Sequence, residues 1–171
     1  TGEPVGLNLD DNTNNMTIVN NTIAFNQSSG IFIASGCENV NIRNNIIVSN
    51  GWNYWTWGIQ CQSTNHPGLS ITYNDVWNNR LDYQNCSAGT GCISADPLFT
   101  SPPTNLHETQ ESPCVDAGDS ADPVGDEPLP NGGRINQGAY GGTNEAATSP
   151  QQVIVPLATA ASNGWIGLYC Q

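Results

Sequence analysis

Short stretches in which apolar and polar residues alternate recur through the first half of the chain. Three of them can be laid over one another: MTIVNNTIAFN from Met16, VNIRNNIIVSN from Val40 and LSITYNDVWNN from Leu69. Alternation with period two is typical of β-strands that turn every second side chain toward a core. A further short strand precedes each segment: GLNL from Gly6, GIFI from Gly30 and GIQC from Gly58.

The three segments align in columns, with a repeat of about 24 to 29 residues that is typical of solenoids. Two columns are apolar and two hold only asparagine: Ile18, Ile42 and Ile71; Ile23, Ile47 and Val76; Asn21, Asn45 and Asn74; Asn26, Asn50 and Asn79. Stacked coils would turn the apolar columns into a continuous core, with backbone hydrogen bonds running between coils. Asparagine suits the bends because it tolerates the left-handed conformation, and stacked amides hydrogen-bond along the axis.

These residues resemble the right-handed parallel β-helix, or pectate-lyase-like, superfamily, whose repeats read N-x-I-x-N-N-x-I. The later elements ISADPLF from Ile93, SPCVDAGD from Ser112 and GRINQGAYGG from Gly133 are similar to the C-terminal end of secreted bacterial proteins of the choice-of-anchor Q type. The expected fold is therefore all-β: a right-handed parallel β-helix of about three coils with an irregular C-terminal section. The resemblance says little about substrate, because this fold carries lyases, hydrolases and adhesins.

The expected division is a β-helix with its C-terminal section over residues 1–142, followed by an extension over residues 143–171. Residues 1–5 contain no clear cap for the first coil, so an open coil edge is predicted. Either upstream coils have been removed or another molecule covers that edge. The β-prone extension would dock on its own solenoid, with a disulfide from Cys170, or on a neighbouring copy, which would give self-association.

The charge of the chain is strongly one-sided, with 15 Asp and Glu against three Lys and Arg and a formal net charge of -12. Such a surface repels nucleic acid and anionic lipid, so neither is an expected partner. Cations, neutral ligands and polysaccharides remain. No signal peptide and no apolar stretch of membrane-spanning length are present, so no membrane insertion is expected and any export signal has been removed.

Six cysteines lie far apart, and their spacing does not match that of zinc ligands. The even number fits disulfides in an oxidising compartment, and buried free thiols are the alternative. Together with the resemblance, this predicts a secreted protein that is extracellular or lies at the cell surface.

An aromatic cluster makes its coil longer than the preceding one, and its rings suit stacking on sugars while nearby Asn and Thr side chains bind hydroxyls. The predicted ligand-binding residues are Trp52, Tyr54, Trp55 and Trp57. The alternative is that these rings cover the side of the helix or a neighbouring subunit.

An acidic loop offers oxygen ligands of the kind that Ca²⁺ prefers. The predicted metal ligands are Asp116, Asp119, Asp122 and Asp126. The alternative is a solvated loop in which one Asp pairs with Arg134 or caps a turn. No other cofactor is expected.

No catalytic residue is assigned. Lyases of this superfamily use a basic side chain beside a uronate, whereas the coils contain only Arg43 and Arg80 and no aligned carboxylates. The hydrolases gather Asp residues on one face, and the Asp residues of these coils share no column.

Three functions stay open. The first is an extracellular, non-catalytic β-helix module for display, adhesion or self-assembly that contacts glycans. The second is the C-terminal fragment of a polysaccharide lyase or glycoside hydrolase, and the third is a calcium-stabilised carbohydrate-binding module.

Overall fold

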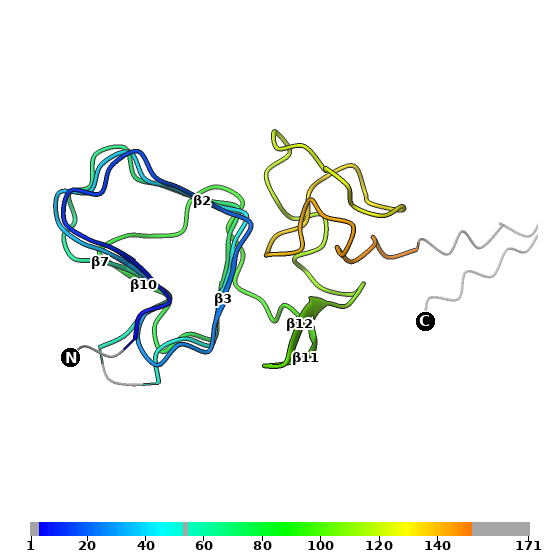
Figure 1. The fold of residues 1–171 in the computed structure, drawn as a ribbon, viewed down its shortest axis with the longest axis horizontal. Helices are drawn as coiled ribbons and strands as arrows, with labels where there is room; N and C mark the ends of the chain where they lie inside the picture. The colour runs from blue at the N-terminus through cyan, green and yellow to red at the C-terminus, as the bar shows by residue number, and fades with distance from the viewer. Residues whose placement is uncertain (1–3, 53–54, 152–171) are drawn as a thin grey trace, which may run out of the picture.

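The computed structural model describes residues 4–52 and 55–151, and these form a stack of short parallel strands followed by an irregular section (Figure 1). The strands make three parallel sheets along the stack. The first sheet contains β1 (Leu7–Leu9), β4 (Ile31–Ile33), β7 (Ile59–Cys61) and β10 (Tyr83–Gln84); the second contains β2 (Thr17–Val19), β5 (Asn41–Arg43) and β8 (Ser70–Thr72); the third contains β3 (Thr22–Ala24), β6 (Ile46–Val48) and β9 (Asp75–Trp77). The predicted all-β solenoid of about three coils is confirmed.

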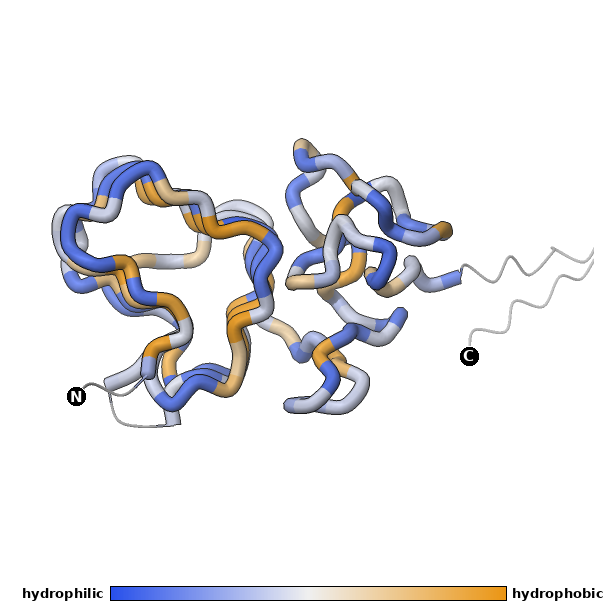
Figure 2. Tube along the Cα trace, in the orientation of Figure 1, coloured by the Kyte–Doolittle hydropathy of each residue, from blue (hydrophilic) through white to orange (hydrophobic). Residues whose placement is uncertain are grey.

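The register of the sheets agrees with the alignment of the repeats. Ile18 pairs with Ile42 and Ile42 with Ile71, while the next column joins Ile23, Ile47 and Val76. These side chains belong to one apolar cluster inside the coils, and Ile42, Ile47 and Val76 are fully buried. Hydrophobic stretches consequently occupy matching positions of successive coils (Figure 2).

The two asparagine columns form hydrogen-bonded ladders along the stack. In one ladder the amide of Asn21 donates to Asn45 Oδ1 at 3.1 Å, and the amide of Asn45 donates to Asn74 Oδ1 at 2.9 Å. The second ladder joins Asn26, Asn50 and Asn79 in the same way, at 2.8 and 3.0 Å. The predicted amide stacking is confirmed.

The sequence predicted left-handed residues at the ladder asparagines, but they lie one residue earlier in the chain. Positive φ angles fall on the residue before each ladder asparagine: Asn20, Asn44 and Tyr73 in one column, Phe25, Ser49 and Asn78 in the other. The ladder residues themselves keep φ negative, and their side-chain amides form hydrogen bonds with main-chain groups at the bend. The left-handed columns accept Phe, Tyr and Ser because the stacked strands on either side fix the turn.

The irregular section follows the last coil and covers the outer face of the third sheet (Figure 1). It begins with an antiparallel hairpin of β11 (Phe99–Ser101) and β12 (Asn105–Glu108). A second apolar cluster joins it to the sheet, because Cys114 and Phe99 pack with Ile46 and Val48. Both sides of this sheet are thus buried.

An ion pair also joins the two parts. Arg43 on β5 donates to both oxygens of Asp122, from Nε at 2.7 Å and from Nη2 at 3.0 Å. The amide of Asn44 donates to the same carboxylate at 2.7 Å. Two donors to one carboxylate fix its orientation as well as its distance. This contact therefore helps to orient the irregular section relative to the coils.

Residues 143–151, the start of the predicted extension, pack on the irregular section. Asn136 Nδ2 donates to Ala147 O at 2.8 Å, and Ser149 N donates to Pro130 O at 2.8 Å. Residues 152–171, including Cys170, lie outside the described residues. Docking of that segment on the solenoid or on another copy stays a prediction.

At the opposite end of the stack, β1, β2 and β3 each pair on one side only among the described residues. The open coil edge expected from the sequence stays a prediction. Self-association through it also stays a prediction.

Candidate functional site

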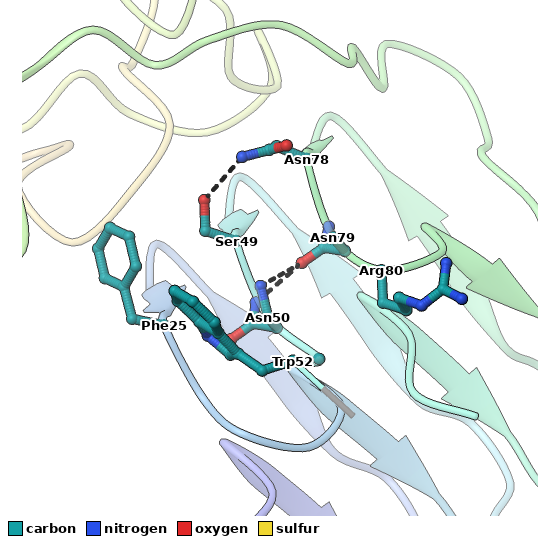
Figure 3. A pocket seen from close by; sticks show the side chains of 8 residues that line it. Phe25, Ser49, Asn50, Trp52, Asn78, Asn79 and Arg80 are labelled. Carbon is teal, nitrogen blue, oxygen red and sulfur yellow. Dashed lines mark hydrogen bonds between the residues drawn. The ribbon is translucent and has the colours of Figure 1, made fainter. Parts of the chain in front are cut away.

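A concave surface of the solenoid lies at the corner that follows the third sheet. It is a groove of about 520 Å³ that crosses three coils. Its lining comprises Phe25, Ser49, Asn50, Gly51, Trp52, Asn78, Asn79 and Arg80 (Figure 3). Each coil supplies residues from the same turn, so the parallel stack itself brings together positions that are far apart in sequence.

Two aromatic side chains from neighbouring coils form the apolar part of this groove. Phe25 is half-buried in the first turn, and Trp52 is 72% exposed in the second. The two rings lie near each other in Figure 3. A largely exposed indole beside a second ring offers a flat apolar surface to a ligand.

Polar groups stand beside the rings and are held in place by the coil ladders. Asn78 Nδ2 donates to Ser49 Oγ at 3.2 Å, and Asn50 Nδ2 donates to Asn79 Oδ1 at 3.0 Å. Asn78 is exposed, so its remaining donor and acceptor capacity faces the groove and solvent. These fixed amides and hydroxyls can recognise hydroxyl groups without reorganising.

Arg80 gives the groove a positive charge on a protein whose formal net charge is -12. It is exposed on the third coil, and Figure 3 shows its guanidinium on the side of the groove away from Phe25. A guanidinium presents several donors in one plane, which matches a carboxylate or a pair of hydroxyls.

Gly51 shapes the turn that presents Trp52. Its φ angle is 81°, and a Cβ at this position would collide with the side chain of Thr56. Only glycine combines this conformation with such close packing. The aromatic turn therefore starts from a fixed backbone.

The predicted aromatic ligand-binding residues lie in different surroundings in the structure. Trp55 is 82% exposed, but it does not line the groove. Trp57 is only 6% exposed, and its main-chain N–H donates to Ser29 Oγ at 3.0 Å. Trp57 is thus buried and does not line the groove, and its role in ligand binding stays a prediction. Tyr54 lies outside the described residues.

The predicted calcium ligands are not gathered at one point. Asp122 is held by Arg43, Asp119 accepts from Ala121 N at 3.0 Å, and Asp126 is exposed. The described part of the chain holds no group of three or more His, Cys, Asp or Glu side chains arranged for a metal ion. Arg134 donates to the carbonyls of Ala117 and Gly118 rather than to an Asp.

Asp116 differs from the other three. It lines a cavity of about 710 Å³ together with Pro130, Gly132 and Ser149, and its Oδ1 is buried without a hydrogen-bond partner. The hydroxyl of Ser149 is likewise buried and unpartnered. Calcium binding in this loop stays a prediction, and Asp116 is the position at which to test it.

Sequence reasoning missed Phe25 and Arg80 as site residues. Phe25 belongs to the column that immediately precedes an asparagine ladder, and Arg80 immediately follows the same ladder. The aligned repeats already place Phe25 beside Ser49, and extending them by one residue at the C-terminal end would have placed Arg80 beside Gly51.

Residues 2–76 match the family described as right-handed beta helix region. That match covers less than half of the chain and includes the coils that carry Phe25 and Trp52. Searches of curated proteins and of solved structures found no match.

With the parallel register above, this match establishes the fold as a right-handed parallel β-helix. Resemblance to the choice-of-anchor Q type stays a prediction. Among residues 4–52 and 55–151, no helix is long and apolar enough to span a membrane.

Proposed function

We propose that this protein is a β-helix module that binds a polysaccharide strand in the groove between Phe25, Trp52 and Arg80. The observation that carries the proposal is the exposed Trp52 ring, which lies beside Phe25 in a groove whose other lining is mainly amide, hydroxyl and guanidinium. Sugars present apolar ring faces and a rim of hydroxyl groups, so a site of this composition suits them.

The repeat of the solenoid supports an extended ligand. Neighbouring coils stack about 4.8 Å apart, and equivalent polar residues, Ser49 and Asn78, follow one another at that spacing along the groove. A chain of sugar units can therefore meet similar partners on successive coils. The proposed setting is extracellular, where the protein would contact a cell-surface or matrix glycan.

Isothermal titration calorimetry of the full chain with a neutral glucan and with a polyuronate tests this function. We expect binding to at least one of them, and we expect Trp52→Ala to weaken it about tenfold or more. A tenfold change corresponds to about 1.4 kcal/mol, which the loss of one stacked ring can supply. Arg80→Gln should weaken binding of the polyuronate more than that of the glucan.

Trp55→Ala is the matched control, because Trp55 is as exposed as Trp52 but does not line the groove. It should bind like the wild type. Equal losses in both variants, or no binding of either polysaccharide, would contradict the proposed site. Release of unsaturated uronates from the polyuronate would show instead that the chain is a lyase.

A further inference from the structure

Thiols gather at one corner inside the solenoid. Cys37, Cys61 and Cys86 come from three successive coils, and all belong to or pack against the main apolar cluster. Cys37 and Cys61 are fully buried, whereas Cys86 is half-buried. Among the described cysteines the structure contains only free thiols, so the disulfides expected from the sequence are not seen there.

Cys61 and Cys86 are direct neighbours. β7 and β10 pair in parallel with Gln60 opposite Gln84, which places Cys61 opposite Asn85. Asn85 is left-handed, with φ of 53°, and this turns Cys86 back toward the coil interior. There its thiol lies 3.6 Å from the carbonyl oxygen of Ile59, and the two thiols share a hydrogen bond.

The two thiols are not chemically equivalent. The hydrogen bond from Cys61, the larger effect, holds the pKa of Cys86 below its ordinary value. The same bond, together with burial, raises the pKa of Cys61. Since the thiolate is the nucleophile in disulfide exchange, Cys86 is the thiol that reacts first.

Cys86 can also be reached from outside. It lines an open cavity of about 350 Å³ that is bordered by Thr64, His66 and Leu69. Cys61 does not line this cavity. The geometry thus offers an accessible attacking thiol with a buried thiol directly behind it.

We propose that Cys86 and Cys61 form an oxidisable dithiol that closes to a disulfide linking the third coil to the fourth. The oxidant is an external disulfide that enters the cavity beside His66. Cys86 lies one residue beyond Asn85, which faces Cys61. On strands about 4.8 Å apart, an offset of one residue gives a Cα separation of about 6 Å, within the range of about 4.4–6.8 Å that disulfides require.

The reaction balances in two exchange steps. The Cys86 thiolate attacks one sulfur of the external disulfide, which forms a mixed disulfide and releases one thiolate. Cys61 then loses its proton and attacks the Cys86 sulfur, which releases the second thiol. The protein loses two electrons and two protons, and the external disulfide is reduced to two thiols.

Oxidised glutathione added to the fully reduced full-length chain tests the proposal. Intact-mass spectrometry should show the loss of two hydrogen atoms without a retained adduct, and peptide mapping should find Cys61 linked to Cys86. The closed form should unfold at a higher Tm than the reduced form. Cys61→Ala should stop at a glutathione adduct on Cys86.

Cys92→Ala is the matched control, since Cys92 is also half-buried beside the apolar cluster, but its thiol donates to the carbonyl oxygen of Ile71. It should oxidise at the wild-type rate, whereas Cys86→Ala should show no fast step. A different linkage, such as Cys37 to Cys61, or oxidation that occurs only in urea, would overturn the proposal. The peptide map of the oxidised wild-type protein tests the proposed Cys61–Cys86 linkage even if a variant fails to fold.

Discussion

Asn45 uses every hydrogen-bonding site of its side-chain amide. Its Oδ1 accepts from the main chain and the side chain of Asn21, at 2.9 and 3.1 Å. Its Nδ2 donates to Ile18 O and to Asn74 Oδ1, both at 2.9 Å, and to Arg43 O at 2.8 Å. The residue is fully buried, so this network replaces all of its contacts with water.

Asn45→Ala should therefore lower the free energy of unfolding by about 3 kcal/mol. The reason is that it leaves several buried main-chain groups without partners, each at a cost of roughly 1–3 kcal/mol. Urea unfolding followed by circular dichroism measures the effect. Asn8→Ala is the control, because Asn8 is exposed and its side-chain amide donates to the exposed Asp10. A loss no larger than that of the control would show that the ladder does not stabilise the coils.

At this scale the sequence predicted the ladders but not the left-handed residues. Recurring asparagines signal a stacked amide because few other side chains both donate and accept in one plane. The positive φ at Phe25 and Tyr73 carries no such signal, because it is imposed by the neighbouring strands rather than by the residue type.

Each strand of the coils is only two or three residues long and gains its stability from the stack. Ile42 shows this best: it lies between Ile18 and Ile71 in the central coil and is fully buried. A single coil could not bury such a side chain, which is why solenoid repeats fold together.

Ile42→Ala should cost roughly 2–5 kcal/mol, because it opens a cavity in a packed column. Ile42→Val should cost about 0.5–1.5 kcal/mol, since it removes one methyl group. Thermal unfolding of both variants, beside Val19→Ala on the exposed side of the neighbouring strand, gives the comparison. Similar values for Ile42→Ala and Val19→Ala would mean that the column is not a packed core.

The sequence also left the outer face of the third sheet unassigned. Ala24, Val48 and Trp77 point away from the coil interior, where a solvated face would be expected from alternation alone. Instead they pack with Cys114 and Phe99 of the irregular section. Nothing in the repeat indicates this, because the covering segment follows the coils and shares no period with them.

At the scale of the whole molecule, the contact between the solenoid and the irregular section contains buried acids. Asp75 on β9 is fully buried; its carboxylate accepts from Ala95 N at 3.0 Å and from the Cys114 thiol at 3.4 Å. Burial raises its pKa to about 6, and nearby Asp82 and Asp96 act in the same direction. Glu108 on β12 has its pKa raised to about 7, again by burial.

The direction of the pH dependence follows from these two groups. Well below pH 4, both carboxyls are protonated in the folded and the unfolded protein. As the pH rises toward 7, the unfolded chain releases protons that the folded protein still binds, so the free energy of unfolding falls. The stabilisation is present at acidic pH and is lost once the pH passes the raised values near 6 and 7.

Asp75→Asn should remove the part of this dependence that belongs to Asp75. A neutral amide keeps an acceptor for Ala95 N and carries no charge to bury, so the variant should be more stable than the wild type at pH 8. The gain should be about 3 kcal/mol, since a shift from 3.8 to about 6 is converted at about 1.4 kcal/mol per pH unit. At pH 4 the two proteins should differ little.

Urea unfolding at half-unit steps between pH 4 and pH 8 measures the difference. Asp11→Asn, which alters an exposed carboxylate, should follow the wild-type curve throughout. If Asp75→Asn instead destabilises the protein equally at every pH, the Asp75 carboxyl is a structural acceptor whose titration does not affect the contact between the two parts.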